Sequence, residues 1–124
     1  QDASVYGAQV FYPWEEAART DVRSGEHSSR DFAESVQKSL ENNISDGRER
    51  KAMAKNDILI FDNVKAKIIL IECGFLSNPK ESQLLQTPEY QQQLSNAIWE
   101  GVNEILCLKK VERIQVIDSA NKDT

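Results

Sequence analysis

The sequence predicts an α/β domain in which a mixed or parallel sheet is flanked by helices. Two runs of four consecutive apolar residues, 58–61 and 68–71, are typical of strands that are buried on both faces. Two later segments, beginning after Asn78 and after Thr87, carry the start signals and the spacing of amphipathic helices. Buried strands together with amphipathic helices favour a layered α/β arrangement.

The composition fits one small acidic domain. The chain has 124 residues, with 15 Lys or Arg against 20 Asp or Glu, which gives a formal net charge of −5. The apolar share of 40% is too high for a disordered chain, and the acidic balance argues against a nucleic-acid partner. No stretch approaches the roughly 18 apolar residues of a bilayer span, so we expect no transmembrane segment. Two cysteines are too few for a disulfide-stapled scaffold.

The first expected elements are a strand, a polar loop and a helix. Residues 8–12 are rich in β-branched and aromatic types and predict a short strand that Pro13 ends. A polar loop over 14–27 follows. Ser28, with an acid three residues later, predicts a helix start, and this helix should stop near 42–43. Its apolar face is spaced by four residues: Phe32, Val36 and Leu40.

The second half of the chain should add two strands and two helices. A polar turn over 45–51 leads to the apolar runs, which we expect as strands joined by a polar connection. Asn78 with a proline behind it predicts a short helix, and the spacing after Thr87 predicts a long helix over 88–108. The end of the chain should add a strand at 114–117. The apolar stripe of the long helix comprises Tyr90, Leu94, Ala97, Ile98, Gly101, Val102, Ile105 and Leu108.

About three strands are readable in this chain. A sheet of that size, apolar on both faces, would leave an unpaired edge and uncovered apolar surface. Strand-like residues also begin close to Gln1, which is not an initiating Met. We therefore expect that the chain begins within a domain and that its fold is incomplete.

Glu72 is the candidate catalytic residue. It directly follows the apolar run 68–71 and precedes Gly74 and the loop into the short helix. A carboxylate at the carboxyl end of a buried strand occupies the usual place of an α/β active site, where it suits general acid–base chemistry. The alternative is a structural role, in which Glu72 ends the strand and pairs with a nearby base.

The sequence around Glu72 resembles that of a known protein family. Residues 71–81, Ile-Glu-Cys-Gly-Phe-Leu-Ser-Asn-Pro-Lys-Glu, resemble the signature of zinc-dependent N-acetylmuramoyl-L-alanine amidases, and most of all their spore-cortex, germination-specific branch. Residues 7–12, 50–59 and 87–102 resemble the strand after the family's second zinc histidine, the approach to its penultimate strand and its closing helix. The resemblance implies that residues 1–110 are the C-terminal part of a three-layer amidase catalytic domain and that 111–124 form a tail.

The resemblance also implies an activity. Such a domain is a peptidoglycan hydrolase that cleaves the amide between N-acetylmuramic acid and L-alanine. In the family, two His and one Glu hold a zinc ion that activates water, and the Glu of the signature, here Glu72, acts as general base. The resemblance further implies peptidoglycan as the partner and a place in the cell envelope of a bacterium, outside the cytoplasm.

The family's zinc ligands have no counterpart in this chain, because they precede the region that the chain resembles. His27, the single histidine, lies in the polar stretch where we expect it to be solvated, and one His cannot build a three-ligand site. We expect zinc in the complete family domain and none in this chain alone, with a missing N-terminal half or a protein partner supplying the rest. The alternative is an inactive half-domain that binds peptidoglycan or a protein partner.

The remaining reactive or charged residues have structural interpretations. Cys73 should face away from Glu72 and be packed, and a nucleophilic role lacks a neighbouring His. Cys107 should lie in the core. The sequence does not decide whether Cys73 and Cys107 form a disulfide. We expect a solvated turn at the three basic residues Arg48, Arg50 and Lys51. The alternative is that they contact anionic groups of peptidoglycan.

Overall fold

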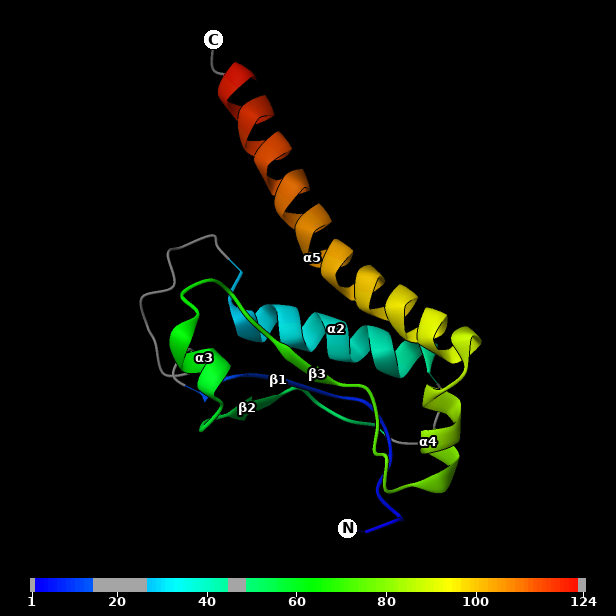
Figure 1. Ribbon diagram of the computed structural model, residues 1–124. Helices are drawn as coiled ribbons and strands as arrows, with labels where there is room; N and C mark the ends of the chain where they lie inside the picture. The colour runs from blue at the N-terminus through cyan, green and yellow to red at the C-terminus, as the bar shows by residue number, and fades with distance from the viewer. Residues whose placement is uncertain (1, 15–26, 45–48, 123–124) are drawn as a thin grey trace.

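The structure of this protein is a computed structural model that describes residues 2–14, 27–44 and 49–122. The expected loop at 14–27 and turn at 45–51 therefore fall largely outside the described residues. The elements, in chain order, are β1 (Gln9–Pro13), α2 (Ser29–Asn43), β2 (Met53–Lys55), α3 (Leu59–Asn63), β3 (Leu70–Glu72), α4 (Pro79–Leu85) and α5 (Pro88–Lys122) (Figure 1).

The described strands form a mixed sheet in the order β2-β1-β3. β1 runs parallel to β2, with Phe11 opposite Met53. It runs antiparallel to β3, with Val10 opposite Ile71. The expected α/β class with a mixed sheet and flanking helices is confirmed. Within the described residues, each outer strand has β1 as its one neighbour.

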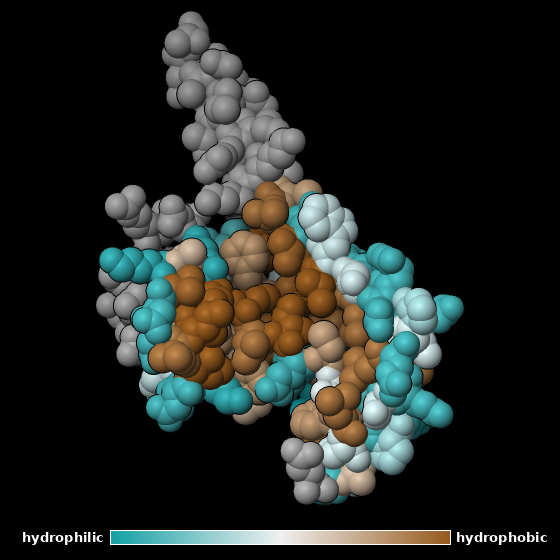
Figure 2. Space-filling view, in the orientation of Figure 1, coloured by the Kyte–Doolittle hydropathy of each residue, from teal (hydrophilic) through white to brown (hydrophobic). Residues whose placement is uncertain are grey.

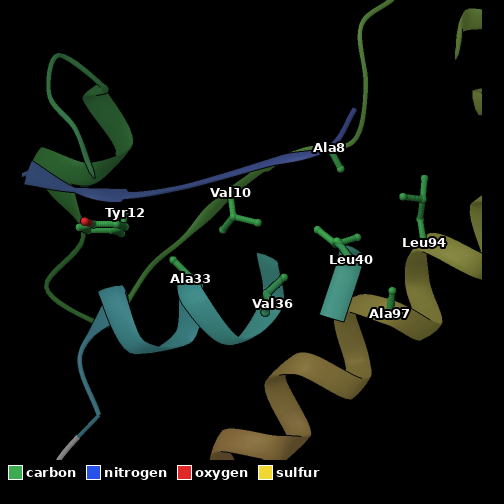
Figure 3. Packing of buried hydrophobic residues seen from close by; sticks show 8 residues of the cluster. All are labelled: Ala8, Val10, Tyr12, Ala33, Val36, Leu40, Leu94 and Ala97. Atoms are coloured by element: carbon green, nitrogen blue, oxygen red, sulfur yellow. The ribbon is translucent and has the colours of Figure 1, made fainter. Parts of the chain in front are cut away.

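The two long helices stack on one side of this sheet. α2 packs against β1, and the first part of α5 packs on the far side of α2 (Figure 1). Figure 3 shows apolar side chains of β1 pointing toward α2, with side chains of α5 closing one end of the cluster. The eight buried residues of the cluster are Ala8, Val10, Tyr12, Ala33, Val36, Leu40, Leu94 and Ala97.

α2 begins where the sequence predicts. The Ser28 hydroxyl accepts a hydrogen bond from the Asp31 N–H (3.1 Å), and the Asp31 carboxylate accepts one from the Ser28 N–H (2.8 Å). These reciprocal bonds satisfy two N–H groups that would otherwise lack a partner at the helix start. Farther along α2, the buried side chain of Gln37 bonds to the backbone of β1, accepting from the Val10 N–H (2.8 Å) and donating to the Ala8 carbonyl (3.1 Å).

Small residues allow α2 and α5 to approach closely. The hydroxyls of Ser35 and Ser39 donate to the carbonyls of Gly101 (2.7 Å) and Ala97 (2.6 Å) across the interface. A Cβ atom placed on Gly101 would lie 2.7 Å from the Cα of Val36, which is backbone and cannot move without shifting the helix. Gly101 is therefore required by packing.

One predicted strand is wrong. The run 58–61 forms the short helix α3 (Leu59–Asn63), of which Phe61 is buried while Leu59 and Ile60 are exposed. A short unbroken apolar run has no periodicity that separates a strand from a helix. The third strand of the sheet is instead β2 (Met53–Lys55), which the sequence analysis missed because it is short and carries a lysine.

The strand expected at 114–117 is also wrong, because α5 continues through Lys122. No Gly or Pro follows Gly101 in the chain, so nothing in the sequence ends the helix early. The division into a domain over 1–110 and a tail over 111–124 stays a prediction. None of the helices in the described ranges combines the length and the apolar character that a membrane span needs.

We predict that Gly101→Ala destabilises the chain although alanine favours helices. The new methyl group must push α5 away from α2, and overpacking of this kind costs about 1–3 kcal/mol of unfolding free energy. Urea denaturation followed by circular dichroism measures the effect. Ser95→Ala, at an exposed position of the same helix, is the control and should change stability by less than about 0.5 kcal/mol. A Gly101→Ala variant as stable as the control would show that the interface between α2 and α5 can accommodate a methyl group at this position.

Candidate active site

Glu72 ends β3 at the edge of the sheet. It lies opposite Gln9 in the ladder between β1 and β3, one residue beyond the pair formed by Val10 and Ile71. Ile71 packs against the core, and successive strand residues point to opposite faces. The half-buried Glu72 side chain therefore lies on the face of the sheet away from α2. Within the described residues, its carboxylate has no hydrogen-bond or ion-pair partner.

A second carboxylate holds the loop that follows Glu72. Glu81, in the first turn of α4, is only 6% exposed. Its carboxylate accepts hydrogen bonds from the N–H of Gly7 (3.0 and 2.9 Å to the two oxygens) and from the N–H of Phe75 (3.0 Å). Hydrogen bonds from backbone N–H groups to a buried carboxylate are strong. The carboxylate therefore ties the segment before β1 to the loop after β3, and we call this arrangement the Glu81 clamp.

Asn78 and Gly74 lie next to the Glu81 clamp and help to position the Glu81 side chain. The Asn78 side chain accepts from the Glu81 N–H (3.1 Å), as predicted for a helix cap, and also donates to the Ala3 carbonyl (3.0 Å). A Cβ on Gly74 would lie 2.3 Å from a Glu81 oxygen, so only glycine leaves room for the carboxylate. The cap has a local sequence signal, whereas the clamp has none, because Gly7 lies 74 positions away from Glu81.

Arg50 lies against the same two segments. Its guanidinium donates to the Tyr6 carbonyl and to the Gln9 side chain (3.4 Å), and it sits 5.5 Å from the centre of the Phe75 ring. The expectation of a solvated turn is therefore wrong for Arg50, which is half-buried. Lys51 is exposed, as expected. Arg48 lies outside the described residues.

His27 is not brought to Glu72. It lies beside the start of α2, where its Nδ1 is 3.7 Å from an oxygen of Asp31. The start of α2 adjoins the beginning of β3, because Ser29 accepts a hydrogen bond from the Ile68 N–H (2.9 Å), whereas Glu72 is at the end of β3. The His27 side chain is only 24% exposed, which corrects the expectation that it is solvated.

The described residues do not fit a zinc site. Across residues 2–14, 27–44 and 49–122, no group of three or more His, Cys, Asp or Glu side chains is placed to hold a metal ion. A zinc site in an enzyme needs three protein ligands that converge on one point. Glu72 therefore lies without a metal-binding cluster among the residues that the structure describes.

The two cysteines occupy different environments, and both are free thiols. Cys73 is half-buried and packs against the core, as expected, and its burial raises the pKa of its thiol. A nucleophilic cysteine needs a lowered pKa, so this environment does not favour thiol catalysis. The expected core position of Cys107 is wrong, since Cys107 is exposed on α5.

A pocket of about 520 Å³ adjoins the Glu81 clamp. The rings of Tyr6 and Tyr90 and the side chains of Leu84 and Lys80 contribute to its wall. Glu72 is not among its lining residues, so this pocket and the candidate catalytic carboxylate are separate features.

One protein-family model and several known proteins match this chain. The model of the N-acetylmuramoyl-L-alanine amidase family matches residues 1–104. The germination-specific N-acetylmuramoyl-L-alanine amidase of Bacillus subtilis (strain 168) is 35% identical over 96 residues, which cover 77% of this chain and 36% of that protein.

Solved structures share the fold. The CwlD amidase of Clostridioides difficile, in complex with the GerS lipoprotein, matches with a TM-score of 0.72 and 30% identity over 87% of this chain and 50% of that chain. An N-acetylmuramoyl-L-alanine amidase of Clostridium difficile 630 matches with a TM-score of 0.65 and 29% identity over 83% and 50% of the two chains. This chain thus spans about half the length of the solved amidases and about a third of the curated relative.

We predict that the Glu81 clamp contributes strongly to stability. Glu81→Ala leaves two backbone N–H groups without their acceptor and should cost about 2–4 kcal/mol of unfolding free energy. Glu81→Gln keeps one oxygen and should cost about 1–2 kcal/mol. Urea denaturation measures both, with the exposed Glu104→Gln as control. Equal stability of all three variants would mean that Glu81 does not hold these segments together.

We also predict unequal reactivity of the two thiols. Because burial raises the pKa of Cys73, less of its thiolate is present near pH 8, and its reaction should accelerate only at higher pH. Iodoacetamide labelling of the folded chain, followed by peptide mass spectrometry, should modify Cys107 about ten times faster. Faster labelling of Cys73 near neutral pH would instead indicate an activated thiol.

Proposed function

Since the chain belongs to the N-acetylmuramoyl-L-alanine amidase family, whose model matches residues 1–104, we propose that it forms the C-terminal part of a peptidoglycan hydrolase. The bond cleaved is the amide between N-acetylmuramic acid and L-alanine. The similarity to a germination-specific amidase supports a role in spore germination. The chain would act together with a segment that supplies the remainder of the domain, as its half-length coverage of solved amidases supports.

The observation that carries this proposal is the position of Glu72. Its carboxylate ends β3 on the open face of the sheet, has no partner among the described residues, and is followed by a loop that the Glu81 clamp fixes. A base must be free to accept a proton and must be held in one place. Both conditions favour a catalytic role over the structural alternative, in which Glu72 would pair with a nearby base.

In the proposed reaction, Glu72 moves one proton. It takes the proton from the attacking water while the water oxygen bonds to the amide carbon. It then gives that proton to the nitrogen of L-alanine as the carbon–nitrogen bond breaks, so the carboxylate is regenerated. The family is generally zinc-dependent. Because the described residues do not fit a zinc site, we propose that any zinc ligands come from outside this chain.

We further propose an extracytoplasmic location, because the cell wall lies there. The solved complex of the CwlD amidase with a lipoprotein supports a protein partner as a second possible source of the missing elements.

The alternative function is a half-domain that binds peptidoglycan or a protein without cleaving it. The lack of a metal-binding cluster in the described ranges is the observation that favours it. Glu72 would then have no chemical role, and its replacement should leave the phenotype unchanged.

A chimeric protein distinguishes peptidoglycan hydrolysis from binding without cleavage. We define the complementary segment as the part of the Bacillus subtilis amidase that this chain does not match, and join it upstream of Gln1. We predict that Glu72→Gln in this chimera lowers release of L-alanine-containing peptides from purified peptidoglycan by about 10²–10⁴-fold. Binding to insoluble peptidoglycan should persist, because the substitution preserves shape.

Glu104→Gln, which removes an exposed carboxylate from α5, is the matched control and should keep full activity. Hydrolysis that is unaffected by Glu72→Gln would refute the catalytic role. A chimera that binds peptidoglycan without cleaving it would favour the half-domain alternative.

A further inference from the structure

One peptide unit shortly before β1 is held by two side chains of opposite charge. This unit joins Tyr6 to Gly7. Its carbonyl oxygen accepts a hydrogen bond from the guanidinium of Arg50, and its N–H donates to both oxygens of the Glu81 carboxylate (3.0 and 2.9 Å). Hydrogen bonds to charged groups are stronger than neutral ones. Because the two bonds polarise the same peptide unit in one direction, each strengthens the other.

The same two side chains also hold Phe75. Glu81 accepts a hydrogen bond from the Phe75 N–H (3.0 Å). The Arg50 guanidinium lies 5.5 Å from the centre of the Phe75 ring, within the range of an attractive cation–π contact. In the described part of the chain, Arg50 and Glu81 do not form an ion pair with each other. They are therefore linked through the peptide unit and through Phe75.

Glu72 lies between these two held points. Its partner in the sheet, Gln9, comes two residues after Gly7, and Phe75 comes three residues after Glu72. Residues 73–75 have no regular secondary structure, so contacts outside the sheet must fix the chain that leaves Glu72. Three residues span about 10 Å at most. A displacement of Phe75 is therefore passed on to Glu72.

The surface beside β3 offers little that could replace these contacts. Figure 2 shows a broad apolar area across the middle of the molecule, in the region where Figure 1 places β3. The run 68–71 carries no charge, and apolar side chains cannot form hydrogen bonds with the loop backbone. The position of the loop therefore depends on Arg50 and Glu81.

Arg50 makes its contacts at a cost to stability. Its Nε atom is buried and has no hydrogen-bond partner among the described residues. A buried N–H without an acceptor destabilises the folded state, and departures of this kind are expected at functional sites. This cost favours a role for Arg50 in function as well as in folding.

We infer that Arg50 is a positioning residue for the proposed reaction. Its guanidinium fixes the peptide unit before β1 and the Phe75 ring, and it thereby holds the Glu72 carboxylate in place. This role rests on the proposed function, in which Glu72 is the general base, and it assigns Arg50 no contact with the substrate. Misplacement of a reacting group by about 1 Å costs about 100-fold in rate.

Amide hydrogen exchange measured by NMR tests the positioning in this chain alone. Arg50→Met removes the charge and the hydrogen bonds and keeps the length of the side chain. We expect it to accelerate exchange at Gly7 and Phe75 about tenfold more than at Val36, which is buried in α2. Lys38→Met, which removes an exposed positive charge from α2, is the control and should leave these rates unchanged.

The chimera with the complementary segment tests the consequence for catalysis. Arg50→Met should lower kcat for peptidoglycan hydrolysis by about 10–100-fold and leave the apparent KM within about threefold. In a chimera that already carries Glu72→Gln, it should lower the residual rate by less than about twofold, because no carboxylate is left to position. A merely structural role would lower the rate by the same factor in both backgrounds.

Arg50→Lys serves for both measurements where Arg50→Met does not fold. It keeps the positive charge and loses the planar guanidinium, so it should show the same pattern with smaller effects.

Three results would overturn the positioning role. These are equal acceleration of exchange at Phe75 and Val36, a kcat equal to that of the Lys38→Met control, and equal losses of rate with and without the Glu72 carboxylate. The proposed function is judged separately. Full hydrolysis by Glu72→Gln would refute that function, whereas loss through Glu72→Gln with an unaffected Arg50→Met would refute only the role of Arg50.

Discussion

The arrangement around Glu72 depends on the buried carboxylate of Glu81. It holds the N–H groups of Gly7 and Phe75 at about 3 Å and so joins the segment entering β1 to the loop leaving β3. The two segments flank the cross-strand pair of Gln9 and Glu72. Without this acceptor, the buried N–H of Gly7 and the half-buried N–H of Phe75 would have no partner, and the loop behind Glu72 would lose its anchor. A structural carboxylate thus positions a second carboxylate that has no described partner.

The second constraint is the size of the sheet. The three short strands of the described residues cannot bury both faces of an apolar run, and all four residues of the run 68–71 are only half-buried. The chain spans about half the length of the solved amidases it resembles. We propose that a further polypeptide segment completes the domain, which would account for both the edge position of β3 and the half-length match. Glu72 ends β3 at the edge of the sheet, where we propose that it acts as the general base.

The sequence predicted the elements that have strong local signals. Ser28 and Asn78 cap helices as expected, and Leu94 and Ala97 of the predicted α5 stripe lie in the core cluster with residues of α2. The sequence-based predictions failed where contacts between distant parts of the chain determine the local structure. The run 58–61 became a helix, while β2 was too short and too polar to be recognised. The Glu81 clamp and the burial of Arg50 involve partners far away in the chain, which no local pattern encodes. Glu72 was found because its signature is contiguous, and its catalytic role stays a proposal.

We propose that this chain contributes the catalytic carboxylate to a site that another segment completes. The most direct test measures peptidoglycan amide hydrolysis by three samples: this chain alone, the complementary segment alone, and the two joined in one polypeptide. We predict activity in the joined protein and none above background in either part. Hydrolysis by the 124-residue chain alone, at a rate comparable to the joined protein, would contradict it.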